Sequence, residues 1–87
     1  MQAVNLTGTQ IRAARGALNW SVQRLADETG VGTATIVRYE LSDSIPRSRK
    51  GNLKTIQKAL EAAGIEFTQA EDGSPGIIIR TEPSKPT

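Results

Sequence analysis

The chain has 87 residues, 37% of them hydrophobic and 23% charged, which is enough for one small domain with a single core. It contains neither histidine nor cysteine, which excludes disulfides, thiol nucleophiles, the usual zinc sites and the commonest general base, so we expect no enzyme and no cofactor. Residues 1–58 hold nine Lys and Arg against four Asp and Glu, whereas residues 59–87 hold two against five; this is typical of a protein whose basic part faces a polyanion, or of a solvated surface.

The first ten residues, MQAVNLTGTQ, lack the basic and apolar regions of a signal peptide. No apolar run approaches the length of about 18 residues that a membrane span needs. The sequence therefore predicts a cytoplasmic protein with no membrane partner.

Two helices are predicted first. Thr7 and Gln10 have the spacing of a capping box, and the apolar residues after them recur at helical intervals, so the first helix covers about residues 8–18. Ser21 is a favourable N-cap for a second helix, which ends at Gly30.

Two more helices follow, on either side of a basic loop. The third covers about residues 33–41, with Ile36 and Tyr39 facing inward, and the polar segment SDSIPRSRKG comes next. Asn52 is predicted to cap the fourth helix, which stops before Gly64.

After the fourth helix the spacing of apolar residues changes from the helical period to an alternation of every second residue, which is typical of a strand. One alternating segment, the turn-forming letters EDGSPG and the apolar run GIIIR predict a β-hairpin over residues 65–80. Residues 81–87 are predicted to be a disordered tail. The expected fold class is mainly α, with a four-helix domain in residues 1–64 and a C-terminal β-hairpin.

Residues 22–41 have the pattern of a helix-turn-helix. Two helices that cross steeply within a short turn need a small residue at the crossing, a residue that tolerates positive φ at the corner, and apolar residues facing inward. Ala26, Gly30, Ile36 and Tyr39 meet these needs in order.

In this pattern the chain resembles the phage-repressor and Cro-like, or XRE-type, helix-turn-helix family. The matching residues are Arg12, Arg15, Trp20-Ser21, Leu25-Ala26, Thr29-Gly30-Val31 and Thr35-Ile36-Val37-Arg38-Tyr39-Glu40. The resemblance implies a Cro/repressor-like fold that binds double-stranded DNA, with the third helix in the major groove. It also implies that Trp20 and Tyr39 belong to the core.

The resemblance further implies which side chains meet DNA. Thr33, Ala34 and Arg38 would contact base edges, with a phosphate contact or a surface ion pair as the alternative for Arg38. Contacts to the DNA backbone would come from Gln23, Arg24, Thr35, Arg47, Ser48, Arg49 and Lys50. A solvated loop is the alternative for the last four. Val22 stands where the family commonly has a glutamine that touches the backbone, so that contact has either moved to Gln23 or been lost.

Two further expectations concern structure and assembly. By the resemblance, Arg15 and Glu40 form an internal ion pair between the first and third helices. Ile77, Ile78 and Ile79 give the hairpin apolar side chains on both faces, and an isolated hairpin is marginal in water. Either the same strand of a second protomer covers it, which makes a homodimer, or it folds back on the first or fourth helix of its own domain.

The predicted function is a sequence-specific, DNA-binding transcriptional regulator, either a repressor or the antitoxin of a toxin–antitoxin pair. The alternative is an interaction adaptor that uses the same fold to bind a protein such as a toxin or a polymerase. The two differ in salt dependence, because DNA binding falls steeply with ionic strength and a packed protein interface does not.

Overall fold

The computed structural model of the protein describes residues 6–47 and 51–80. The elements in chain order are α1 (Gly8–Leu18), α2 (Val22–Thr29), α3 (Thr33–Glu40), α4 (Asn52–Ala62), β1 (Ile65–Gln69) and β2 (Pro75–Ile79). The predicted fold class, mainly α with four helices and a C-terminal hairpin, is confirmed. The predicted disordered tail lies outside the described residues.

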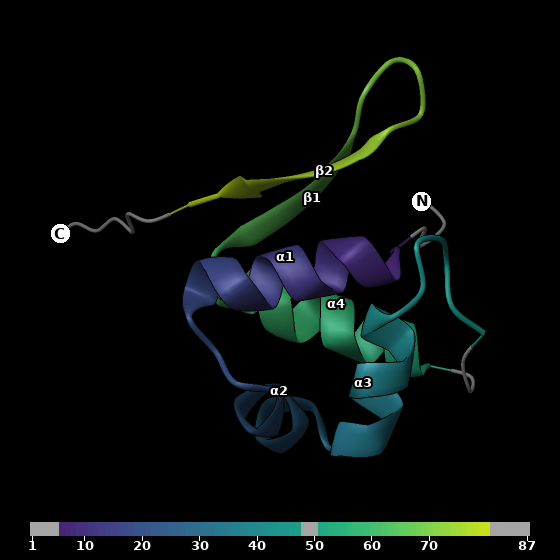
Figure 1. The fold of residues 1–87 in the computed structure, drawn as a ribbon. Coiled ribbons are helices and arrows are strands. Elements are labelled where there is room, and N and C mark those ends of the chain that lie inside the picture. The colour runs from purple at the N-terminus through teal and green to yellow at the C-terminus, as the bar shows by residue number, and fades with distance from the viewer. Residues whose placement is uncertain (1–5, 48–50, 81–87) are drawn as a thin grey trace, which may run out of the picture.

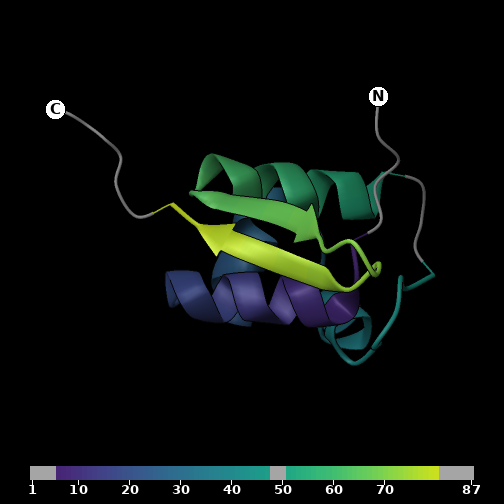
Figure 2. The same cartoon turned by 90° about the horizontal axis from the view of Figure 1, so that it is seen from above.

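The molecule is built in three levels. Helices α1 and α4 form the middle level, the hairpin lies on one side of them, and α2 and α3 lie on the other (Figure 1). Seen from above, β1 runs along α4 and β2 runs along α1 (Figure 2). The hairpin and the α2–α3 unit are therefore on opposite sides of the same helical support.

The first two helices begin as the sequence predicts. The Thr7 hydroxyl accepts the N–H of Gln10 at 3.1 Å, and the Gln10 side chain accepts the N–H of Thr7 at 3.0 Å, which completes a capping box. The Ser21 hydroxyl accepts the N–H of Arg24 at 2.9 Å. The α2 helix ends at Gly30, whose φ of 80° is in the left-handed region that glycine tolerates.

The predicted cap of α4 is wrong by one residue. Gly51, with a φ of 87°, is the N-cap, and Asn52 is the first helical residue. The Asn52 amide instead donates to the hydroxyl of Tyr39 at 3.1 Å. A buried tyrosine hydroxyl needs a hydrogen-bond partner. The Asn52 side chain supplies that partner and does not cap the helix.

The core is aliphatic apart from one tyrosine. Its buried residues are Leu6, Ile11, Ala14, Leu25, Ala26, Val31, Ile36, Tyr39, Leu53, Ile56, Leu60 and Ile65. Trp20, Phe67 and Ile77 are half-buried and pack against this cluster. Every element except β2 contributes at least one buried residue, so the four helices share one core.

One face of the hairpin is turned toward its own helices. Ile65 pairs with Ile79 and Phe67 with Ile77, and facing residues of antiparallel strands point to the same side of a sheet. Ile77 therefore packs against the core of its own chain, whereas Ile78, on the other face, keeps 41% of its surface exposed. The inner face of the hairpin thus folds back on the first and fourth helices, which is one of the two alternatives that the sequence left open.

Within residues 6–47 and 51–80, none of the helices combines the length and apolar character required to cross a membrane.

Candidate functional site

A three-residue turn fixes the angle between α2 and α3. The N–H of Gly30 donates to the carbonyl of Ala26 at 2.8 Å, and the N–H of Val31 donates to the hydroxyl of Thr29 at 3.1 Å. Val31 is buried in the core, so the turn is held from inside as well as by its hydrogen bonds. The outward face of α3 consequently has a defined direction relative to α2.

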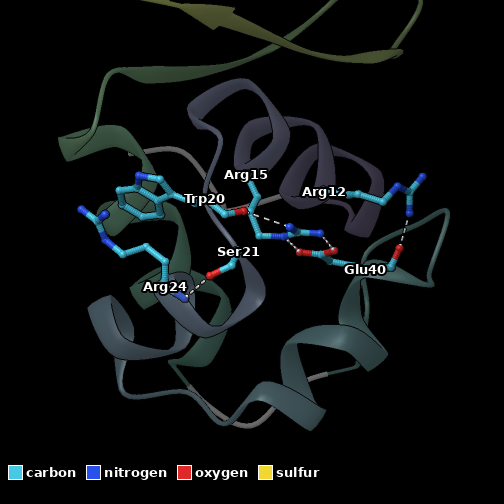
Figure 3. A network of polar contacts seen from close by, with 6 residues as sticks. All are labelled: Arg12, Arg15, Trp20, Ser21, Arg24 and Glu40. Carbon is cyan, nitrogen blue, oxygen red and sulfur yellow. Dashed lines mark hydrogen bonds and ion pairs between the residues drawn. The ribbon is translucent and has the colours of Figure 1, made fainter.

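An ion pair secures the end of α3 against α1. Arg15 Nε and Nη2 each donate to a carboxylate oxygen of Glu40 at 2.8 Å, and Arg15 Nη1 donates to the carbonyl of Trp20 at 3.0 Å (Figure 3). Hydrogen bonding to Glu40 raises the pKa of Arg15 above its usual value, so the guanidinium stays charged. Arg12 donates to the backbone carbonyl of Glu40. The Arg15 guanidinium thus joins α1 to the end of α3 and to the chain between α1 and α2.

The outward face of α3 is exposed and free of negative charge. Ile36 and Tyr39 are fully buried, while the exposed residues of this helix are Thr33, Ala34, Val37 and Arg38. The only acidic residue of α3, Glu40, is buried and paired with Arg15. The guanidinium carbon of Arg38 lies 5.2 Å from the centre of the Tyr39 ring, so a cation is held beside this face. Of the predicted contact residues on α3, only Thr35 is half-buried.

The predicted contact residues of α2 are exposed but already have partners. The Gln23 amide donates to Asp27 at 2.9 Å, and Arg24 Nε lies 2.8 Å from a carboxylate oxygen of Glu28. The Arg24 guanidinium also lies 4.6 Å from the centre of the Trp20 ring (Figure 3). To bind a phosphate, Gln23 and Arg24 would each have to leave the carboxylate that they now contact, or bind the phosphate and the carboxylate together.

The beginning of α2 nevertheless presents donors. Ser21 caps the N–H of Arg24, so the N–H groups of Val22 and Gln23 precede the capped one at the positive end of the helix. Backbone N–H groups in this position favour an anion. Val22 itself is half-buried and packs against the core, which accounts for an apolar residue here.

Of the four predicted contact residues in the basic loop, the described part of the chain includes one. Arg47 is exposed, whereas Ser48, Arg49 and Lys50 lie outside the described residues. The loop ends at Gly51, where α4 begins.

Several contacts were not predicted from the sequence. Arg12 holds a backbone carbonyl, Asn52 holds the Tyr39 hydroxyl, and the Gln10 amide donates to the carbonyl of Gly76 at 2.9 Å. Each joins residues far apart in the chain, and no local pattern marks such pairs. The exposure of Val37 did have a signal, because it lies one turn after Thr33 on the same face of a helix.

In the part of the chain that the structure describes, no group of acidic side chains is arranged to hold a metal ion. A family model described as helix-turn-helix matches residues 11–69, which include all four helices except the start of α1. No curated protein matches the chain.

Proposed function

The chain belongs to the XRE-type family of helix-turn-helix proteins, which bind double-stranded DNA, and from this premise we propose that it is a sequence-specific transcriptional regulator. The observation that supports the proposal most is the outward face of α3, which is exposed, carries a cation and has no exposed carboxylate. An acid on this face would be repelled by phosphates on both sides of the major groove. In our proposal the protein acts as a repressor or as the DNA-binding half of a toxin–antitoxin pair.

In the proposed complex α3 lies in the major groove. Thr33 and Ala34 face base edges from its first turn, and Arg38 reaches a guanine, to which a guanidinium can donate two hydrogen bonds. Leaving the Tyr39 ring costs Arg38 only a weak exposed contact, so the side chain is available for this role.

Phosphates on either side of the groove receive the remaining contacts. The N-terminal end of α2, with Gln23 and Arg24, meets one strand, and Thr35 lies close to the same backbone. Arg47, together with Ser48, Arg49 and Lys50, meets the other. Because Arg24 is shared with Glu28, we expect it to contribute less to the salt dependence than Arg47 does.

We further propose that the protein binds DNA as a homodimer joined through the free edge of β2. The N–H of Arg80 donates to the carbonyl of Gly64 at 2.7 Å, so these two facing residues form a hydrogen-bonded pair. In an antiparallel ladder, hydrogen-bonded and non-hydrogen-bonded pairs alternate along the strands. Ile77 and Ile79 consequently fall in non-hydrogen-bonded pairs, and their backbone N–H and C=O groups point away from β1. Among the described residues the sheet has two strands, which leaves this edge without a β partner. Unpaired strand edges favour pairing with another chain.

Antiparallel pairing of two β2 edges suits DNA binding for a geometric reason. A two-fold axis perpendicular to the joined sheet keeps both sets of helices on one side of it, so both α3 helices face one duplex. Stacking the outer faces of the two hairpins would direct the α3 helices away from each other, because α3 lies opposite the hairpin (Figure 1). Two half-sites about 10 bp apart, or a multiple of that, are therefore expected.

Selection of duplexes from a random pool tests the function and supplies the operator. Arg38→Ala should then weaken operator binding by about 1–3 kcal/mol and relax preference at one base pair in each half-site, with little loss on random DNA. Arg47→Ala is the matched control, since it removes the same type of side chain from a proposed phosphate contact. It should weaken binding to all duplexes similarly and reduce the log–log salt slope by about one per protomer.

Parallel losses on operator and random DNA for Arg38→Ala would contradict its base-reading role. If no duplex is enriched at low salt, the protein is not a DNA-binding regulator, and the adaptor function becomes the better account of the fold.

A further inference from the structure

An apolar stripe runs along the outward face of α3. Thr33, Val37 and Leu41 are spaced four residues apart, so their side chains follow one another along the helix over about 12 Å. Val37 is 45% exposed and Leu41 is 78% exposed. Folding gains little from apolar groups in these positions, since neither belongs to the buried core.

Val37 is suited to make a defined contact. A valine in a helix strongly prefers one χ1 rotamer, so its two methyl groups are held in place before any ligand arrives. It lies between Thr33 and Arg38 on the surface that the proposed function places in the major groove. Glu40, the only acidic residue of α3, is turned inward, so nothing on this helix repels the approach of a phosphate backbone.

The major groove presents one apolar group to such a surface, the C5-methyl of thymine. We infer that Val37 is a specificity-determining residue that packs against a thymine methyl in each half-site. This inference rests on the proposed function. It adds a T·A base pair to the recognised sequence, read by contact between methyl groups rather than by a hydrogen bond.

Replacing each operator thymine in turn by deoxyuridine tests the inference, because uracil keeps the hydrogen-bonding groups of thymine and lacks only the methyl. For the wild-type protein, one position in each half-site should lose affinity by about fourfold per methyl. Val37→Ala should bind the thymine operator more weakly and show no further loss at that position. Val37→Thr, which keeps the shape and replaces one of the two methyl groups with a hydroxyl, should show a discrimination between those of the wild type and Val37→Ala.

Ile45→Ala is the matched control, since Ile45 is 49% exposed in the loop after α3 and outside the proposed groove contact. It should retain the thymine preference of the wild type. Thermal melting shows whether each variant is folded. The deoxyuridine scan of the wild-type protein tests the inference even if a variant does not fold.

A flat uridine scan with intact operator binding would overturn the inference and leave the proposed function standing. An equal loss in wild type and Val37→Ala would also overturn it, because another residue would then contact the methyl. Absence of any selected operator would overturn both.

Discussion

Arg15 and Glu40 are the residues whose loss should affect the position of α3 most. Only 21% of the arginine side chain and 7% of the glutamate side chain are exposed, so removal of one partner leaves a largely buried charge. Arg15→Ala should therefore lower the free energy of unfolding by about 3 kcal/mol, which corresponds to a melting temperature lower by roughly 15 °C. The double variant Arg15→Met, Glu40→Met leaves no unpaired charge and should recover much of the loss.

The exposed pair of Arg24 with Glu28 is the internal control for this comparison. Its side chains are 52% and 43% exposed, so Arg24→Ala should cost less than about 1 kcal/mol in the same melting experiment. Equal losses from Arg15→Ala and Arg24→Ala would show that the Arg15–Glu40 pair contributes no more than a surface contact.

At the level of elements, Gln10 connects α1 to the hairpin. Its side chain is part of the α1 capping box, and its amide also donates to the carbonyls of Gly76 at 2.9 Å and Thr68 at 3.4 Å. Gln10→Glu keeps an acceptor for the cap and removes both donors to the strands. Hydrogen exchange of the hairpin amides should become at least about tenfold faster, while α1 stays protected.

Thr7→Ala separates the α1 cap from the contact between Gln10 and the hairpin. It removes the hydroxyl that caps α1, at a cost of about 1 kcal/mol, and leaves the Gln10 amide in contact with Gly76. Faster exchange should then appear at the start of α1. Loosening of the hairpin by Thr7→Ala alone would show that the cap and the strand contacts are not separable.

For the whole molecule, the proposed dimer can be tested by removing one hydrogen-bond donor. The N–H of Ile79 points to the free edge of β2, so Ile79→Pro keeps the ladder with β1 intact and removes a donor from the proposed interface. Sedimentation should show a dimer for the wild type and a monomer for this variant. Ile79→Ala loses the same side-chain packing but keeps the N–H, and should remain more dimeric than Ile79→Pro.

A second variant checks the same edge through charge. Ile78→Lys adds one positive charge to each copy of the β2 edge strand, and repulsion between the two copies should weaken association while the helical unit stays folded. An unchanged dimer in Ile79→Pro and Ile78→Lys would exclude the β2 edge as the interface.

The sequence predicted most of this architecture because its elements carry local signals. The capping box at Thr7, the cap at Ser21 and the glycine after α2 each depend on residues within four positions of one another, and the structure has all three. Asn52 was misplaced because its partner is a hydroxyl on another helix. The Arg15–Glu40 pair between α1 and the end of α3 was expected, but the close approach at Gly8 was not. A methyl at Gly8 would overlap the carbonyl oxygens of Tyr39 and Ser42, and a glycine in a sequence does not reveal what lies beside it.

The separation of the two sides of α3 has a consequence for evolution. Its inner side is fixed by the core and by the Glu40 pair, whereas Thr33, Ala34, Val37 and Arg38 are exposed. Substitutions at exposed helical positions usually change stability by less than about 0.5 kcal/mol. Under the proposed function, descendants of this chain acquire new operators through these four codons without compensating mutations in the core, and exchange of the same four residues retargets the protein.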